Sequence, residues 1–426
     1  MILFASTIAG AFCGLYVGTG SPLHNQGSEV VVARNADGTL VLTLAPDYEG
    51  ALADFGLVIP VPAGTGDADV RVADPVALAH LGVYSAPRLV RYTCEDLYPY
   101  YWAGEWHDEG DPRFHGCAGG DIQIGCSSES YLLGSSSAYA QAEGVAVEER
   151  LVEGDYEISV LSAENSAGLL TYLGSEGYVL DASAATALQS YIDQGLQFLV
   201  AKVRLDEAGE AWLTPLQIDL PASSSVAVPI RLGTENAVGP QDVELYLLDA
   251  GGRGYVQNYP EVPLGTDCMP EGLDRASALP AYWAEVLDET FAGEPAAWTT
   301  VFAWHSAYAC DPCPPEGQTF FEVDALELGF HDGYPLITRL HVRWEPDPGL
   351  EDLVIGFGQA DAEVKIQATY ILHDPLLEGD FPMCGDDVPR ALDSLCPDAP
   401  RSTHGAAFGP AALLGAAWLA VRRLRR

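Results

Sequence analysis

Two cysteines separated by two residues form the sharpest chemical motif of the chain, Cys310-Asp311-Pro312-Cys313. Such a pair is redox-active when the first cysteine opens a helix, because the helix dipole then lowers the pKa of its thiol. Here two further prolines follow the motif and favour an extended chain, and no strand–helix–strand pattern precedes it. We therefore expect a structural disulfide between Cys310 and Cys313, with an extracytoplasmic thiol–disulfide oxidoreductase as the alternative.

Residues 107–117 contain the densest group of potential metal ligands, namely His107, Asp108, Asp111, His115 and Cys117. A zinc site needs three or four converging ligands, and His115 with Cys117 would supply two of them. Cys117 and Cys126 also bracket a short loop suited to a disulfide, and a bridged sulfur cannot bind a metal. We therefore expect a disulfide here and no metal or cofactor, with a metal-dependent hydrolase built on this loop as a second alternative.

The common hydrolase motifs do not occur in the sequence. It contains neither a Gly-x-Ser-x-Gly nucleophile turn nor a His-Glu-x-x-His zinc motif. His341 lies in the alternating run LITRLHVRW, which predicts a hydrogen-bonded strand residue rather than a general base. We therefore predict no catalytic residue and expect the body of the chain to have a binding or structural role.

The charge balance argues against nucleic acid as a partner. The sequence has 61 acidic and 20 basic residues, which gives a formal net charge of −41 at pH 7. A surface this acidic repels phosphate backbones. The hydrophobic content of 48% provides enough material for packed cores, so the chain is expected to fold.

The cysteine content and the first residues indicate export. Nine cysteines are many for a reducing compartment when metal-finger spacing is absent. Residues 1–11 are apolar or small and finish with Ala9-Gly10-Ala11, a pattern typical of a signal-peptidase site. We therefore predict a signal peptide over residues 1–11 and an exported mature chain, with a buried first strand as the alternative for these residues.

Residues 405–421 carry no charge and are followed by four arginines, Arg422, Arg423, Arg425 and Arg426. As a helix this segment would be about 25 Å long, which is marginal for crossing a membrane, and the arginines favour a cytoplasmic end. A cysteine, an apolar segment and an arginine cluster resemble the sorting tails of myxobacterial surface proteins, with Cys396 as the matching cysteine. The resemblance implies a chain anchored in the cell envelope or at the cell surface by a C-terminal membrane helix, with its C-terminus in the cytoplasm unless the tail is processed.

Strand-like runs outnumber helical ones along the body. Strands are predicted at 29–34, 39–45, 55–61, 156–161, 197–205, 211–220, 226–232, 243–248, 297–303, 336–344, 353–357 and 364–372. Helices are predicted at 75–84, 166–173, 183–194, 279–292 and 320–328. This order predicts an α+β fold that is strand-rich, with mainly antiparallel sheets, a few helices, two subdomains and a C-terminal apolar helix.

The chain is expected to divide into consecutive regions. They are a signal peptide (1–11), an N-terminal β-rich region (12–150) with a disulfide-tied insertion (94–137), an α+β region (151–265), a C-terminal α+β region (266–384), a linker (385–404) and a transmembrane or sorting tail (405–426). The linker is rich in proline, aspartate and small polar residues, and this composition distinguishes it from the body.

Several motifs in a fixed order resemble a family of secreted bacterial proteins, the domain of unknown function 2330. They are the hairpin over 29–45 with the following FGLVIPVP, then YEISVLSAENSAGLLTYL, GYVLDASAATALQSYIDQGLQFLVAKVRL, PIRLG, the cysteine pair at 310 and 313, and LITRLHVRWEP. Together they span most of residues 13–375. The resemblance implies export, often with a membrane tail, and it supplies no catalytic residues.

Overall fold

The computed structural model of the chain describes a body made mostly of strands. The described residues are 9–10, 15–18, 28–46, 55–90, 144–154, 156–178, 184–203, 214–234, 239–265, 279–308, 322–347, 349–359 and 365–371. The predicted insertion, the linker and the apolar tail lie outside these residues, as does most of the predicted signal peptide.

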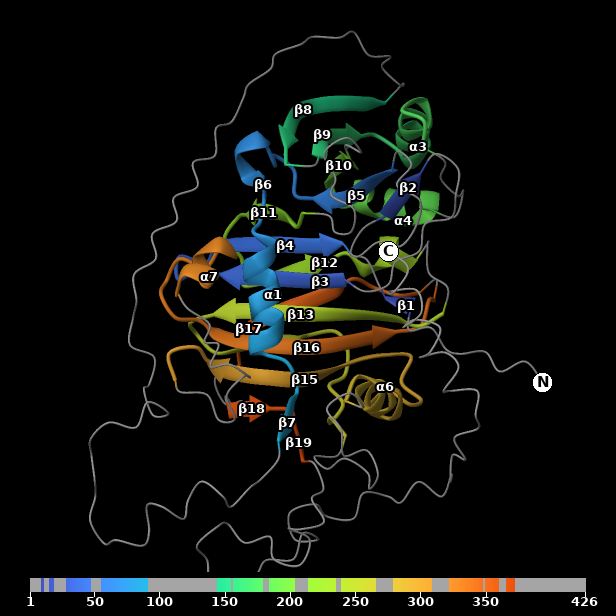
Figure 1. The fold of residues 1–426 in the computed structure, drawn as a ribbon. Helices are drawn as coiled ribbons and strands as arrows, with labels where there is room; N and C mark the ends of the chain where they lie inside the picture. Colours follow the sequence, from blue (N-terminus) through green and yellow to red (C-terminus); the bar gives the residue numbers. More distant parts are fainter. Residues whose placement is uncertain are drawn as a thin grey trace, which may run out of the picture.

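A nine-stranded sheet forms the centre of the fold (Figure 1). Its path runs β18 (Lys365–Gln367), β15 (Ala296–His305), β16 (Leu336–Trp344), β13 (Gln241–Asp249), β3 (Ser28–Arg34), β4 (Leu40–Pro46), β11 (Leu216–Leu220) and β6 (Val70–Val72), while β1 (Ala9–Gly10) pairs with the start of β13. Only β3 and β1 pair in parallel, both with β13. The sheet therefore joins strands from early, middle and late parts of the chain.

The hairpin of β3 and β4 closes through a turn at residues 35–38, as its sequence predicts. Gly38 adopts a φ of 85°, and its N–H donates to the carbonyl of Asn35 at 2.8 Å. The Asn35 side chain donates to the carbonyl of Gly329 at 3.2 Å and accepts from the N–H of His331 at 2.9 Å. The turn thus also fixes the loop that leads into β16.

A second, five-stranded antiparallel sheet lies at the upper end of the molecule in Figure 1. Its order is β2 (Leu15–Gly18), β5 (Phe55–Val61), β10 (Gln197–Val203), β9 (Tyr156–Ala163) and β8 (Val145–Glu153). The helices α3 (Ser166–Ser175) and α4 (Ala184–Asp193) cover one face, where Leu169 and Leu188 are fully buried. The other face joins the main core through residues such as Leu199.

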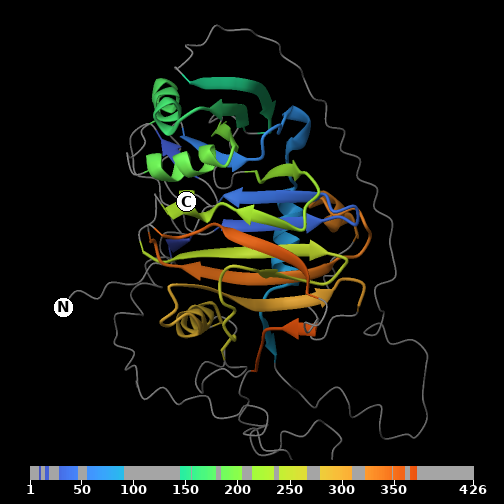
Figure 2. The ribbon, with the colours of Figure 1, turned by 180° about the vertical axis from the view of Figure 1, so that it is seen from behind.

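Both faces of the nine-stranded sheet are covered. The helix α1 (Pro75–Tyr84) crosses its front face in Figure 1, beside α7 (Glu322–Glu327). A three-stranded sheet, β12 (Ser225–Val228), β17 (Leu353–Gln359) and β14 (Arg253–Val256), covers the opposite face and is nearest the viewer in Figure 2. The helix α6 (Leu279–Thr290) packs at the β15 side of the sheet. The main core therefore lies between the three sheets.

Three short elements complete the described body. β7 (Arg88–Val90) follows α1 and pairs in parallel with β19 (Thr369–Ile371). The single helical turn α5 (Ile230–Gly233) follows β12. A 3₁₀ turn at Asp67–Asp69 leads into β6.

The expected strand-rich fold with mainly antiparallel sheets and few helices is confirmed. β5, α1 and β16 have the predicted boundaries, and most other predicted elements differ from the observed ones by a few residues at their ends. No helix among the described residues is long and apolar enough to cross a membrane. The C-terminal apolar helix falls outside the described residues and stays a prediction, as does the division into subdomains.

Two strand predictions need correction, and one long strand was not predicted. The predicted strand 226–232 is wrong in its second half, because β12 ends at Val228 and a helical turn begins after Pro229, which has no N–H for a strand ladder. The predicted strand 364–372 is two short strands, β18 and β19, with different partners. β8 was not predicted, since it is an edge strand with a largely exposed, charged sequence.

We expect Gly329→Ala to destabilise the fold more than Gly333→Ala. Both glycines have positive φ values, 83° and 89°, so an alanine at either position costs roughly 1–2 kcal/mol of backbone strain. A Cβ at Gly329 would also lie 2.5 Å from Cγ1 of Val41, whereas Gly333 has open space around it. Gly329→Ala should therefore lose about 1–3 kcal/mol more of the free energy of unfolding than Gly333→Ala, a difference typical of overpacking. Urea unfolding of the two variants measures this difference. Equal unfolding midpoints for the two variants would show that the contact with Val41 relaxes freely.

Candidate functional site

Ionisable side chains are concentrated on two neighbouring strands of the nine-stranded sheet. β13 and β16 both alternate apolar and polar residues, and their apolar residues face the main core. Their polar residues therefore share the opposite face. We call five of them the charge ladder: Arg343, Asp242, His341, Glu244 and Arg339.

Opposite charges alternate along the charge ladder. Asp242 accepts from Nε of Arg343 at 2.7 Å, and the same carboxylate lies 2.7 Å from Nε2 of His341. Glu244 lies 2.8 Å from Nδ1 of His341 and accepts from Nε of Arg339 at 2.8 Å. Each carboxylate is thus shared between two cationic side chains, an arrangement in which charge-assisted hydrogen bonds are strongest.

The side chains of the charge ladder are largely buried, so each charge needs a partner of opposite sign. The side chain of His341 is 6% exposed, and that of Asp242 is 10% exposed. Burial by itself disfavours the imidazolium, but the carboxylates of Glu244 and Asp242 outweigh it and raise the pKa of His341 to about 9. Burial likewise disfavours the Glu244 carboxylate, yet Arg339 and His341 hold its pKa well below the usual range. His341 is therefore an imidazolium at neutral pH.

The two ends of the charge ladder attach helices to the sheet. Arg339 donates through Nη1 to the carbonyl of Gly82 in the last turn of α1, at 3.1 Å. Arg343 donates through Nη1 to Oδ1 of Asp288 on α6, at 2.7 Å. Phe291, just after α6, lies with its ring centroid 5.7 Å from that of His341. The ladder thus lies between the sheet, α1 and the end of α6.

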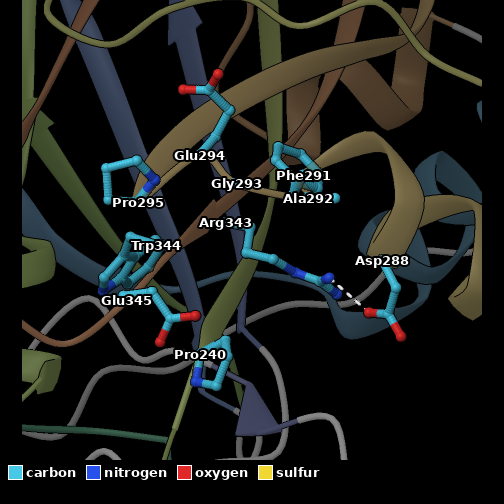
Figure 3. A pocket seen from close by; sticks show the side chains of 10 residues that line it. All are labelled: Pro240, Asp288, Phe291, Ala292, Gly293, Glu294, Pro295, Arg343, Trp344 and Glu345. Carbon is cyan, nitrogen blue, oxygen red and sulfur yellow. Dashed lines mark hydrogen bonds and ion pairs between the residues drawn. The ribbon is translucent and has the colours of Figure 1, made fainter.

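A pocket of about 450 Å³ opens at the Arg343 end of the ladder (Figure 3). We call it the α6 pocket. Its walls come from the turn after α6, the end of β16 and the residue before β13. Arg343 and Asp288 form one side, and Figure 3 shows the ion pair between them.

A half-buried carboxylate outside the charge ladder joins other layers of the fold. Asp352, just before β17, accepts from the hydroxyl of Tyr191 on α4 at 2.8 Å and from the N–H of Arg231 in α5 at 3.1 Å. Burial raises the pKa of Asp352, and these hydrogen bonds partly offset that effect. The carboxylate ties the helices of the five-stranded sheet to the three-stranded sheet, which is a structural role.

The residues singled out from the sequence as candidate disulfides lie outside the described residues. This holds for Cys117, Cys126, Cys310 and Cys313, for the sorting cysteine Cys396, and for the ligand-rich segment 107–117. Both disulfides therefore stay predictions. Within the described residues, no group of three or more histidine, cysteine, aspartate or glutamate side chains is placed to hold a metal ion.

Comparison with known proteins assigns the chain to a family without adding an activity. Residues 7–354 match the family described as "Uncharacterized protein conserved in bacteria (DUF2330)". The chain belongs to this family. No curated protein and no solved structure matches it. The DUF2330 match includes the whole charge ladder and the α6 pocket, and it ends before the predicted linker and tail.

The structure confirms the interpretation of His341 as a hydrogen-bonded strand residue. Both of its ring nitrogens are bound to carboxylates, so neither is available to a substrate in this arrangement. The ladder as a unit is absent from the expectations drawn from the sequence. A signal was present, because acids at alternate positions in DVELYL and bases at alternate positions in RLHVRW are complementary across paired strands.

The stability contributed by His341 should disappear at alkaline pH. A folded-state pKa of about 9 against an ordinary 6.5 means that this stability is fully present below pH 6.5 and is lost as pH rises through 9. The loss should be on the order of 3 kcal/mol, at roughly 1.4 kcal/mol per pKa unit. Urea unfolding between pH 6 and pH 10 measures it, with His341→Gln as the variant that cannot titrate. A difference between the two proteins that stays constant with pH would contradict the raised pKa.

Removing one arginine of the ladder should cost far more stability than removing an exposed one. Arg339→Met leaves Glu244 buried without its guanidinium partner and is expected to cost roughly 3–5 kcal/mol. Arg71 pairs with Asp219 at 2.7 Å, but both side chains are more than a third exposed. Arg71→Met should therefore cost at most about 1 kcal/mol. Thermal and urea unfolding of both variants check the contrast, and similar losses would argue against a tightly coupled ladder.

Proposed function

We propose that this chain is an exported protein anchored in the cell envelope, and that its body binds a partner rather than catalysing a reaction. The charge ladder carries the second part of the proposal. Burial and close partners shift the pKa values of its ionisable groups, and each group is held by protein partners. Such groups stabilise a rigid scaffold, whereas a catalytic acid or base must reach its substrate.

The proposed location is supported by the sequence. The acidic, cysteine-containing body suits an oxidising aqueous space. The apolar segment 405–421 with the following arginines suits a membrane anchor whose basic end stays in the cytoplasm. Cys396 is the proposed processing point of the tail.

We assign the proposed binding role to the α6 pocket. Small-ligand sites are concave, largely preformed and a few hundred Å³ in volume. The α6 pocket has a volume in this range, about 450 Å³, and the ion pair of Arg343 with Asp242 holds one of its walls. A rigid body with a preformed surface pocket is what a displayed binding protein requires.

Removal of residues 405–426 should release the protein from the envelope. We expect the complete chain in the membrane fraction, where a protease added outside cells or spheroplasts degrades its body, and the shortened chain in the soluble extracytoplasmic fraction. Mass spectrometry of the mature protein would locate both ends and the disulfides. As a control, Arg71→Met should leave the distribution unchanged. An intact chain in the cytosol with all thiols free would refute the proposal.

A further inference from the structure

The outward side of α1 is apolar. Val76, Ala79 and Val83 are exposed and lie three and four positions apart, so they share one face of the helix, which we call the α1 surface. Val76 is 70% exposed and Val83 is 45% exposed. Leu326 on the adjacent α7 is a further exposed apolar side chain, at 41%. Exposed apolar side chains that are grouped in this way mark a contact site.

The composition of α1 is that of a helix packed on both sides. Apart from His80 and the buried Tyr84, its residues PVALAHLGVY are apolar or glycine, and Nδ1 of His80 lies 3.1 Å from Oδ2 of Asp324 on α7. Leu78 and Leu81 are buried on the inner side, against the nine-stranded sheet. A helix that faces water carries polar residues on that side, whereas a helix that is apolar all round is buried. The α1 surface is therefore expected to have a packing partner.

The chain leaves the described body close to α1. β7 begins three residues after the helix and ends at Val90, and the described chain resumes at Gly144, directly before β8. In Figure 1, β7 lies at the lower end of the molecule and β8 at the upper end, with α1 between them. Residues 91–143 therefore connect two places that lie on either side of α1.

The first part of this connection has the composition of a packing partner. Six of residues 92–106 are aromatic, namely Tyr92, Tyr98, Tyr100, Tyr101, Trp102 and Trp106. Such side chains bury a large apolar area while their polar atoms stay near water, which suits a shallow apolar surface. The eight residues from Val90 to Tyr98 span at most about 27 Å. β7 and α1 placed end to end are about 25 Å long, so residues 98–106 are able to reach the α1 surface.

The size of the α1 surface favours a tethered segment over a second copy of the chain. A helix about 15 Å long and about 10 Å wide offers roughly 150 Å² of surface. A stable interface between two proteins buries about 800 Å² on each partner. A segment of the same chain needs a smaller area, because its covalent attachment already holds it at a high effective concentration.

We propose that residues 98–106 pack on the α1 surface, with the aromatic rings of Trp102 and Trp106 against Val76 and Val83. This contact buries the outer side of α1 and holds the start of the segment 91–143 against the nine-stranded sheet. It is independent of the proposed location of the protein and of the α6 pocket.

Photo-cross-linking of the full chain tests the contact. The photoreactive amino acid p-benzoylphenylalanine replaces Val76 in one variant and Val83 in another, positions where exposure should allow the change. After irradiation, peptide mass spectrometry should find intramolecular cross-links to residues 98–106, with a yield that does not change on dilution. Trp102→Ser/Trp106→Ser should lower that yield at least about fivefold, because the contact loses its largest apolar side chains.

Two controls accompany this test. Tyr131→Ser/Tyr139→Ser removes two aromatic side chains elsewhere in the same segment and should leave the yield unchanged. The photoreactive residue in place of Gln194, an exposed residue just after α4, should give no cross-link to residues 98–106. Cross-links between two chains, cross-links to another part of the chain, or the absence of cross-links from positions 76 and 83 would overturn the proposal. Equal effects of the two double variants, or equal labelling of residues 98–106 from position 194, would overturn it as well.

Discussion

Five ionisable side chains lie on one face of a sheet with little access to water, and this constraint shapes everything packed around them. A buried carboxylate or cation is tolerated only when its partners are in place. Asp242 and Glu244 are each shared between two cationic groups, and His341 joins them. A shift of one residue in the pairing of β13 with β16 would turn the polar residues of the shifted strand towards the apolar core and away from their partners, so the ladder favours the observed register.

The two faces of β13 and β16 serve different purposes. Residues such as Leu245 and Trp344 face the core shared by the three sheets, and the alternate residues form the ladder beneath α1 and the end of α6. The same alternation thus supplies both the apolar contacts and the ionic contacts of the central strands. Since the DUF2330 match spans this region, the family assignment refers to the scaffold and leaves the tail outside it.

Elements with a strong local signal were predictable. β16 has the expected boundaries because its apolar residues alternate clearly. α1 begins as expected at Pro75, directly after its N-cap Asp74, and the hairpin turn at Gly38 has the required positive φ. β8 was missed because the sequence of this edge strand, VAVEERLVE, has no regular alternation of apolar and polar residues. The site was only partly predictable. His341 was expected to be a hydrogen-bonded strand residue, but its partners were not identified, because they lie about a hundred positions away in the sequence.

The order of residues alone establishes the strongly acidic charge and the resemblance to DUF2330, and it predicts the strand-rich class and the export and anchoring signals that motivate the proposed location. These depend on composition and on short-range periodicity, which a single chain displays directly. The tertiary structure decides which residues that are distant in the sequence become neighbours. Asp242 and Arg343 are 101 positions apart and meet because β13 pairs with β16, while the turn after α6 closes the pocket beside them. Apart from the complementary charges of these two strands, local patterns do not identify which distant strands pair, because that choice depends on the packing of the entire core.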